Sequence, residues 1–479
     1  MNETIYDFIV IGGGVAGYSA ALKAVPQMRV AIIEREKIGG TCLNKGCIPT
    51  KSYRWLASQY KAARENKIRN NGMEKSISEN EKSVIESHIY DVVDKLQNGL
   101  VLTLKNAGID IYHGEVLSAQ NNEKILIKGL GGEEYTLGFR WLLIATGSQP
   151  VIPPVCDPSV NKNITGRNVF SSDLAFMKKN IAPESILIVG GGVIGVEFAS
   201  LLSEFGSHVI IVEQRDRIIE NFSEDISRTV TKILRNKGIR ILTGWKVTDI
   251  QEEDDESIVT IEDIPHAKNN DNHIEEILVN KVLVAVGRIP KMNHDLLNAL
   301  SVETANDQIK VNEYYETSND RVYAAGDVCS KTQLAYVASY QGEIVADRII
   351  SRMSNTTRPQ FEISNIPSCV FMNPEVAQIG ICADTIDLNS TAYRVSKYSL
   401  KGNGMSVLQD KADGYVKLIA ENDSGVIVGA ELVCPDAVEI VTLCRTWIEN
   451  KLTAKDVVCE IFPHPSISEA LKEAAKGLI

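Results

Sequence analysis

Two cysteines near the start of the chain have the type and spacing for thiol–disulfide chemistry. Cys42 and Cys47 stand in the stretch GGTCLNKGCIPTK (residues 39–51), with four residues between them. A thiolate can attack a disulfide and form a new one, so two neighbouring thiols can take up and release an electron pair. We interpret them as a redox-active pair. Most of the other cysteines are expected to be buried apolar thiols.

The spacing of the pair constrains the backbone that carries it. A disulfide needs Cα atoms within about 7 Å. Positions five apart in a regular helix exceed this, at about 1.5 Å rise per residue plus the angular offset. Cys42 and Cys47 therefore cannot share an undistorted helix. Pro49 suits the first turn of a helix that begins near Cys47, and Lys51, one turn further on, can face the same way as Cys47.

A group that could transfer protons lies close to the C-terminus. His464 begins the run HPSISE, which ends at Glu469. An unperturbed imidazole titrates near about pH 6.5, so His464 could take a proton from a thiol and return it. A carboxylate such as Glu469 could orient the ring and stabilise its cation. A lone His-Pro pair is more often structural, so these residues alone leave the role open.

The elements that must position these groups begin with a glycine-rich turn. The apolar run at residues 6–11 predicts a buried strand, and Gly12, Gly14 and Gly17 follow in the G-x-G-x-x-G spacing before a second strand that ends at Glu34. The glycines permit a tight turn, close approach of a pyrophosphate and helix–strand packing. A phosphate group fits the helix N-terminus, and Glu34 can accept hydrogen bonds from a ribose. The sequence predicts a βαβ dinucleotide-binding unit.

The same fingerprint recurs in the middle of the chain, after a strand at residues 185–189. It consists of Gly190, Gly192 and Gly195, and the next strand ends at Glu213. Two fingerprints predict two dinucleotide sites. Glu213 would bond a ribose 2′-hydroxyl and repel a 2′-phosphate, which favours NAD over NADP. Arg215 and Arg217 weigh against this preference because nearby arginines could receive a phosphate.

Composition excludes several classes of protein. The chain has 479 residues, 44% of them hydrophobic, and a formal net charge of -12. An acidic chain lacks the basic surface of a general nucleic-acid binder. No stretch reaches the roughly eighteen uninterrupted apolar residues of a membrane span, and the N-terminal MNET enters a strand without a cationic leader. We expect a cytoplasmic protein, with no metal site.

Together the motifs resemble one known family over nearly the whole chain. The cysteine motif, both fingerprints, the AAGD run at residues 324–327 and HPSISE occur in the order typical of the pyridine nucleotide–disulfide oxidoreductases. The resemblance implies an α/β fold with two Rossmann-like domains, for FAD and NAD, plus a C-terminal α+β dimerisation domain. The implied bounds are 1–150 and 285–357 (FAD), 151–284 (NAD) and 358–479 (dimerisation).

The resemblance also assigns roles to individual residues. It implies a Cys42–Cys47 disulfide, with Cys42 facing the substrate and Cys47 the flavin, and it makes His464 the base and Glu469 its partner. The residues expected at FAD are Gly12, Gly14, Gly17, Glu34, Lys51, Gly114, Thr146, Gly147, Asp327 and Ala335. The residues expected at NAD are Gly190, Gly192, Gly195, Glu197, Glu213, Val247 and Gly287.

The members most similar to this chain imply a substrate and partners. They oxidise the dithiol of a reduced lipoyl group, carried on the lipoyl-carrier domains of 2-oxoacid dehydrogenase or glycine-cleavage complexes. The family also implies a homodimer in which Cys42 of one chain and His464 of the other complete each site.

Two positions depart from the family pattern. Tyr336 follows Ala335 where many members have histidine in an LAH motif, and Lys45 lies between the cysteines where many have valine. Lys45 is expected to add positive potential near the thiols.

Other members of the class fit less well. A glutathione-type reductase would use NADP, which Glu213 opposes. A mercuric reductase typically has a C-terminal cysteine pair, whereas this chain ends EAAKGLI, and a soluble transhydrogenase would normally lack Cys42. A purely structural or carrier-binding subunit would not need the cysteines, His464 and Glu469 together.

Overall fold

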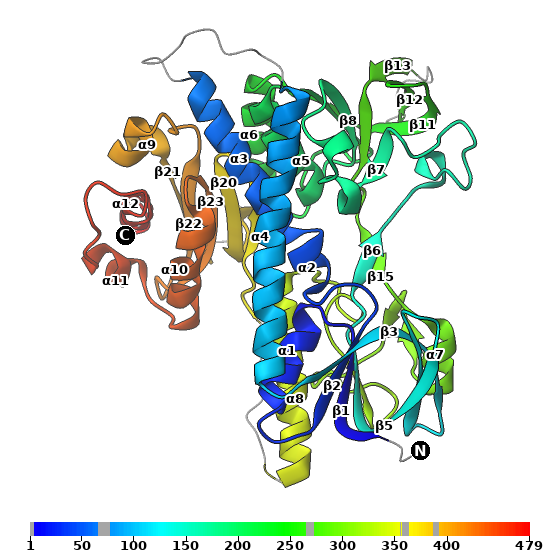
Figure 1. Cartoon of the computed structure of the whole chain (residues 1–479). Helices are drawn as coiled ribbons and strands as arrows, with labels where there is room; N and C mark the ends of the chain where they lie inside the picture. Colours follow the sequence, from blue (N-terminus) through cyan, green and yellow to red (C-terminus); the bar gives the residue numbers. More distant parts are fainter. Residues whose placement is uncertain (1–3, 66–76, 265–272, 355, 357–363, 387–391) are drawn as a thin grey trace.

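The computed structural model describes residues 4–65, 77–264, 273–354, 356, 364–386 and 392–479. Three lobes surround a long central helix in Figure 1. The first lobe combines the N-terminal part of the chain with a later segment that ends at residue 354. The residues between these two segments form the second lobe, and the C-terminal part of the chain forms the third. Within these described ranges, no helix has the length and apolar character needed to cross a membrane.

The first lobe contains a six-stranded sheet. Its strands are β1 (Ile5–Ile11), β2 (Val30–Glu34), β3 (Asp110–Gln120), β4 (Lys124–Gly129), β5 (Glu134–Ile144) and β18 (Val322–Ala324). β1 pairs in parallel with β2 and β5, β5 pairs in parallel with β18, and β4 is antiparallel to both its neighbours. The apolar run of β1 is buried over most of its length, as expected for a central parallel strand.

The helices of this lobe include the two that contain Cys42 and Cys47. α1 (Val15–Ala24) packs on α8 (Ala335–Ser354) so closely that a Cβ on Gly342 would lie 2.2 Å from the carbonyl oxygen of Ala16. The cysteines lie in α2 (Gly40–Asn44) and α3 (Cys47–Glu65), and the long α4 (Glu79–Asn106) begins with a capping box formed by Ser78 and Glu81. α7 (His294–Ala299) and the short pair β16 (Thr304–Ala305) and β17 (Gln308–Ile309) complete the lobe.

The second lobe contains a parallel sheet in the order β10-β9-β8-β14-β7. The strands are β7 (Val169–Ser171), β8 (Ser185–Val189), β9 (His208–Glu213), β10 (Arg240–Thr243) and β14 (Lys281–Val284), with helices α5 (Val193–Phe205) and α6 (Glu224–Asn236). An antiparallel sheet of β11 (Trp245–Glu252), β12 (Ser257–Asp263) and β13 (Ile274–Val279) packs beside it. β6 (Ser148–Pro150) and β15 (Arg288–Pro290) pair where the chain leaves and re-enters the first lobe.

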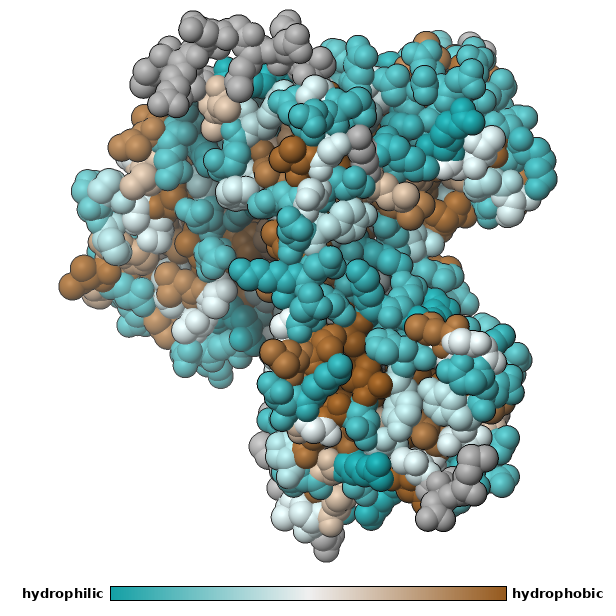
Figure 2. All heavy atoms as spheres, in the orientation of Figure 1, coloured by the Kyte–Doolittle hydropathy of each residue, from teal (hydrophilic) through white to brown (hydrophobic). Residues whose placement is uncertain are grey.

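The third lobe contains an antiparallel five-stranded sheet with helices. Its strands, in sheet order, are β19 (Ser368–Val370), β20 (Glu375–Gly380), β23 (Ile427–Cys434), β22 (Tyr415–Glu421) and β21 (Tyr393–Ser399). Its helices are α9 (Gly404–Leu408), α10 (Ala437–Glu449), α11 (Ala454–Cys459) and α12 (Glu469–Lys476). Figure 2 shows a mostly hydrophilic face, with apolar atoms gathered beside the lower half of α4.

The predicted fold class is confirmed: two Rossmann-type sheets, the first of which includes the antiparallel strand β4, precede an α+β unit. Because β18 joins β5, residues 322–324 return to the first sheet after the second lobe. The exact domain bounds stay a prediction, and the expected junction at residues 357–358 lies outside the described residues.

Candidate active site

A break between two helices brings the cysteines together. Cys42 lies in α2 and Cys47 is the first residue of α3, while Lys45 leaves helical geometry at φ -138° and ψ -3°. The pair therefore does not share one regular helix, which agrees with the spacing argument. Pro49 lies in the first turn of α3, where its missing amide costs no helical hydrogen bond.

The cysteine-bearing segment begins directly against the first glycine fingerprint. Gly39 and Gly40 have φ values of 105° and 59°, in the left-handed region that glycine adopts most readily. A Cβ on Gly40 would lie only 2.7 Å from the Cα of Gly14. Since Gly14 is the N-cap of α1, the position of Cys42 is tied to the dinucleotide turn through two glycines.

The two sulfurs differ in their acidity. In the described residues all nine cysteines are free thiols, and the Cys42 thiol donates a hydrogen bond to Cys47. This bond raises the pKa of Cys42 and lowers the pKa of Cys47 to about 7. Burial opposes the second shift and the Lys51 ammonium supports it. Cys47 is therefore the thiolate of the pair.

Lys51 connects the cysteine helix to the second lobe. Its ammonium lies 3.0 Å from a carboxylate oxygen of Glu197 in α5, and the Glu197 side chain is 8% exposed. The other Glu197 oxygen accepts a hydrogen bond from the amide of Phe371, 2.9 Å away, and the Lys51 ammonium lies 3.9 Å from the centroid of the Phe371 ring. Elements of all three lobes thus meet beside Cys47.

This contact changes the interpretation of two predicted residues. Glu197 was expected at NAD, but its carboxylate faces Lys51, and a contact with NAD stays a prediction. Lys45 was expected to raise the potential near the thiols. Its ammonium pairs with Glu36, and the effect of Lys45 on the thiols stays a prediction; Lys51 is the cation that acts to lower the pKa of both thiols.

The first fingerprint has room and donors for a pyrophosphate. Gly12 has φ 104°, and a Cβ there would lie 2.3 Å from the carbonyl oxygen of Ala145; one on Gly17 would lie 2.0 Å from that of Gly12. The N-cap Gly14 supplies no side-chain cap, and the first turn of α1 holds no acid, so its amides are open to an anion. Glu34 accepts a hydrogen bond from the Gly13 amide at 2.7 Å. These residues fit FAD.

The structure brings further residues predicted to bind FAD to the same edge of the sheet. Thr146, Gly147 and Asp327 follow the parallel strands β5 and β18, whose ends lie beside that of β1. Asp327 accepts a hydrogen bond from Ser148 at 2.6 Å. Gly114 lies further out in β3, and a Cβ there would lie 2.6 Å from the carbonyl oxygen of Lys128.

Tyr336 and Ala335 begin α8. The Tyr336 hydroxyl donates to the carbonyl of Pro367, and burial raises its pKa. The residue that departs from the family pattern therefore joins α8 to the segment that leads to Phe371.

The second fingerprint repeats the geometry of the first. Gly190 has φ 107°, and a Cβ there would lie 2.5 Å from the carbonyl oxygen of Ala285. The amides of α5 begin at Gly192 without a side-chain cap. The Glu213 carboxylate accepts a hydrogen bond from the Gly191 amide at 2.6 Å, as Glu34 does from Gly13. The structure brings Gly190, Gly192 and Glu213 together, and these residues fit a second dinucleotide.

Two further residues predicted to bind NAD lie close to this fingerprint. Gly287, with φ 123°, follows β14, and Val247 in β11 packs against the cluster that contains Val189 and Val212. The guanidinium of Arg215 pairs with Glu220, and that of Arg217 donates to the carbonyl oxygens of Phe222 and Glu220 at 2.7 and 2.9 Å. Both arginines thus have partners within their own loop.

His464 and Glu469 form a hydrogen-bonded pair. The His464 Nδ1 atom lies 2.9 Å from Glu469, which also accepts a hydrogen bond from the Ser466 amide at 2.8 Å. These bonds lower the pKa of Glu469. The His464 side chain is 80% exposed, and its peptide bond with Pro465 is cis. Among the described residues, no hydrogen bond or ion pair joins His464 to either cysteine.

Sequence reasoning missed three groups that complete the site. Phe371 lies in an ordinary apolar run, and no motif indicates its contact with Lys51. Ser148 donates to Asp327, and Arg288 donates to Ser148 at 2.9 Å and pairs with Asp173 at 2.9 Å. The only available signal was the position of Ser148 directly after the predicted Thr146-Gly147 turn.

Two family descriptions match the chain in succession. Residues 6–342 match "Pyridine nucleotide-disulphide oxidoreductase", and residues 366–475 match the dimerisation domain of the same family. The family uses FAD and NAD, in agreement with the two glycine fingerprints, whose open helix amides fit a dinucleotide.

Curated relatives and solved structures match over the full length. A dihydrolipoyl dehydrogenase of Bacillus subtilis is 32% identical, covering 98% of this chain and 98% of the relative, and one of Mycoplasma genitalium is 31% identical, covering 99% and 98%. An HOCl-induced flavoprotein disulfide reductase from Escherichia coli superposes with a TM-score of 0.83 at 25% identity, covering 98% of this chain and 99% of that one. LpdA from Mycobacterium tuberculosis, at 22% identity and covering 99% and 100%, shares the fold with a TM-score of 0.84.

Proposed function

The chain belongs to the pyridine nucleotide–disulphide oxidoreductases, and we propose that it is a dihydrolipoyl dehydrogenase. It oxidises the dithiol of dihydrolipoamide to a cyclic disulfide and passes the electron pair through Cys42 and Cys47 and FAD to NAD. Curated relatives with this activity match it at 28–32% identity over nearly their whole length. The observation that carries the proposal is the asymmetric thiol pair beside Lys51.

The two cysteines have separate tasks. In the oxidised enzyme they are joined as a disulfide. A substrate thiolate attacks the sulfur of Cys42, the Cys42–Cys47 bond breaks, and Cys47 leaves as a thiolate. Its low pKa, supported by Lys51, makes it the better leaving group. The second substrate thiolate then attacks the sulfur of its own molecule, which releases cyclic lipoamide and returns Cys42 as a thiol.

His464 supplies the proton transfers. It removes a proton from a substrate thiol, because the thiolate is the nucleophile, and it returns a proton to Cys42 when the product leaves. Glu469 fixes the ring and favours its cation through the 2.9 Å bond to Nδ1. When bound, FAD would supply the two-electron chemistry that links this dithiol to NAD.

Residues in the two fingerprints hold the cofactors. The open amides at the N-termini of α1 and α5 donate hydrogen bonds to the pyrophosphates. The carboxylates of Glu34 and Glu213 accept hydrogen bonds from ribose hydroxyls, using the lone pairs that are not bonded to backbone amides. Glu213 faces a nucleotide 2′-position without a free arginine beside it, since Arg215 and Arg217 have partners in their loop. This arrangement supports NAD over NADP.

The functional unit is a homodimer, formed through the dimerisation domain at residues 366–475. We propose that His464 acts on Cys42 of the partner subunit. The 80% exposure of His464 supports this arrangement, as does that of Ile461 nearby, which is 96% exposed. Covering an apolar side chain of this kind with a second chain lowers the free energy of the dimer, because it removes apolar surface from water.

The biological setting follows from the substrate. The natural dithiol is a lipoyl group on the carrier domain of a multienzyme complex, and a cytoplasmic location stays a prediction.

Steady-state rates with dihydrolipoamide test the function. We expect turnover with NAD, and at most about one-hundredth of that rate with NADP because Glu213 repels its phosphate. Cys47→Ser should abolish turnover while FAD remains bound. Equal rates with NADP, or turnover by Cys47→Ser, would contradict the proposal.

A further inference from the structure

We propose that an ion network between the C-terminal lobe and α6 holds the loop that selects the pyridine nucleotide. Asp225, Lys417 and Glu431 are then positioning residues for NAD, although Lys417 and Glu431 belong to a different lobe from the nucleotide fingerprint. The inference rests on the proposed function, because it takes the second fingerprint and Glu213 as the NAD site.

The loop in question, residues 214–223, joins β9 to α6 and is bonded to the fingerprint. The Glu213 carboxylate, at its start, accepts hydrogen bonds from the amides of Gly191 at 2.6 Å and Arg215 at 2.9 Å. Further along, the amide of Ile219 donates to the carbonyl of Gly191 at 2.8 Å. A Cβ on Gly191 would lie 2.6 Å from the Ile218 side chain. Movement of this loop would therefore displace Gly191 and turn Glu213.

The loop contains a backbone conformation that needs support. Ile219 has φ 42°, in the left-handed region that β-branched residues rarely adopt, and its side chain is 3% exposed. Such a conformation persists only where surrounding structure over-determines it. Within the loop, Arg217 donates to the carbonyls of Phe222 and Glu220 at 2.7 and 2.9 Å, and the loop also takes support from outside.

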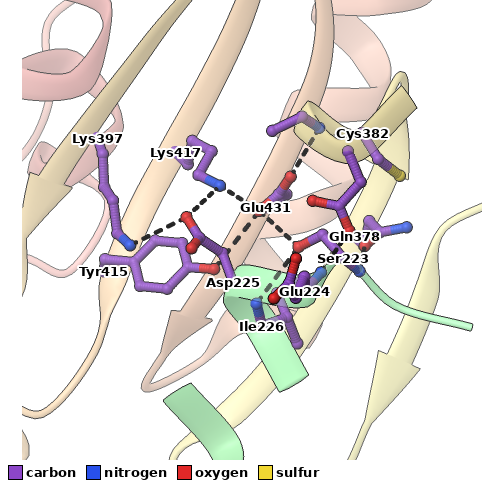
Figure 3. A network of polar contacts seen from close by, with 12 residues as sticks. Ser223, Glu224, Asp225, Ile226, Gln378, Cys382, Lys397, Tyr415, Lys417 and Glu431 are labelled. Carbon is purple, nitrogen blue, oxygen red and sulfur yellow. Dashed lines mark hydrogen bonds and ion pairs between the residues drawn. The ribbon is translucent and has the colours of Figure 1, made fainter. Parts of the chain in front are cut away.

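That support comes from the start of α6. Ser223 caps α6, and its hydroxyl donates to Glu431 of β23 at 2.8 Å while its amide donates to Gln378 of β20 at 2.8 Å. The ammonium of Lys417 in β22 lies 2.7 Å from Asp225 and 2.8 Å from Glu431 (Figure 3). One buried cation thus bridges a carboxylate of α6 and a carboxylate of the third sheet.

The network is charged, and its members in the C-terminal lobe are enclosed, whereas the Asp225 side chain is 31% exposed. The side chains of Lys417 and Glu431 are 3% and 0% exposed. Burial by itself would raise the pKa of Asp225, but Lys417 and Lys397 lower it to about 2, so it is ionised at neutral pH. Outer partners complete the set: Lys397 and Arg228 each lie 3.2 Å from Asp225, and Glu431 also accepts from the Ala383 amide at 3.0 Å.

The first turn of α6 transmits this position to the loop. The hydroxyl of Ser227, which is 1% exposed, donates to the carbonyl of Ile218 at 2.8 Å. A shift of the α6 N-terminus would therefore act on Ile218 and Ile219, and through them on Gly191 and Glu213. Buried ion pairs rarely stabilise a fold more than well-packed apolar residues of the same volume. A directional role, which apolar packing would not supply, accounts for ions at this junction.

Binding of ADP-ribose to the FAD-loaded homodimer tests the inference, because this probe carries the adenosine ribose and pyrophosphate but no redox group. We expect Ser223→Ala and Lys417→Met to weaken binding about tenfold by calorimetry, as when the ordered loop is populated about a tenth of the time. The KM for NAD should rise in the same proportion, while the KM for dihydrolipoamide and the FAD content stay unchanged. Glu275→Gln, which removes the exposed 2.6 Å pair with Arg240 in the same lobe, is the control.

The outcomes separate this inference from the proposed function. If both variants bind ADP-ribose as tightly as the unmodified enzyme and only lose thermal stability, the network is structural and the inference fails. Should Lys417→Met not fold, Ser223→Ala decides, since it removes a single hydroxyl. If the unmodified homodimer does not bind ADP-ribose at all, the proposed nucleotide site fails, and the inference fails with it.

Discussion

The unequal acidity of the two active-site thiols arises from a few neighbours. Cys42 donates its proton toward Cys47, and the Lys51 ammonium favours the thiolate form of Cys47 further. Glu197 limits this effect, because its carboxylate raises the pKa of Cys47 and pairs with the same ammonium. The balance leaves Cys47 ionised near neutral pH and Cys42 protonated, which matches one thiol that leaves and another that is attacked.

The pH dependence of Cys47 alkylation tests this balance. A lowered pKa means that the thiolate is present above about pH 7 and is lost as the pH falls through that value. We expect the rate of iodoacetamide labelling at Cys47 in the reduced enzyme, measured by mass spectrometry, to reach half its maximum near pH 7. Lys51→Met should move the midpoint upward. A wild-type midpoint at the ordinary thiol value, about 8.5, would contradict the account.

His464 should be essential to dithiol oxidation. We expect His464→Asn to lower kcat/KM for dihydrolipoamide by about 10²–10⁴-fold, the range for loss of a general base. Glu469→Gln should have a smaller effect, since it weakens only the orientation of the ring. His294→Asn, at an exposed position in α7, is the matched control. Rates within threefold of wild type for His464→Asn would exclude its role as the base.

At the scale of elements, glycines set the distance between the cysteine helix and the first fingerprint. Gly40 has φ 59° and lies against Gly14, the N-cap of α1. We expect Gly40→Ala to force these segments apart and to lower the FAD content of the purified protein, measured by its flavin-to-protein absorbance ratio. Gly99→Ala, in α4 with no atom within 4 Å of the added Cβ apart from the neighbouring helix backbone and adjacent residues, should retain FAD. Full FAD content in Gly40→Ala would contradict this close contact.

Local elements could be predicted because their signals are local. Each fingerprint combines a strand, three spaced glycines and an acid within 29 residues (6–34 and 185–213), and both turns form as the spacing indicates. The disruption between α2 and α3 also follows from the cysteine spacing alone. The contact between Lys51 and Glu197 could not be predicted this way, because it depends on how α3 packs against α5, 146 residues away.

At the scale of the whole molecule, we propose that a second chain completes the site. The thiols lie between the first two lobes, whereas His464 lies on an exposed loop of the third. The family resemblance predicted three units and a dimer. It could not predict the network of Asp225, Lys417 and Glu431, because no motif marks those residues and they meet only when two lobes pack together.

Mixed dimers test the sharing of active sites between subunits. Co-expression of Cys42→Ser with His464→Ala should restore about a quarter of wild-type activity, since random pairing makes half the dimers mixed and each of these has one intact site of two. Neither variant alone should be active. A purified mixed dimer without activity would show that each chain uses its own His464.

The most direct test of the dithiol cycle is the state of Cys42 and Cys47 during turnover. Anaerobic enzyme with FAD can be trapped with iodoacetamide before dihydrolipoamide is added, after it is added, and again after NAD is added, with labelling of each cysteine quantified by mass spectrometry. The account predicts that both cysteines are protected at first and that dihydrolipoamide makes Cys47 label readily and Cys42 more slowly, because Cys42 stays protonated. Both are protected again when NAD removes the electrons. NADH formation without any change in the labelling of Cys42 and Cys47 would contradict it.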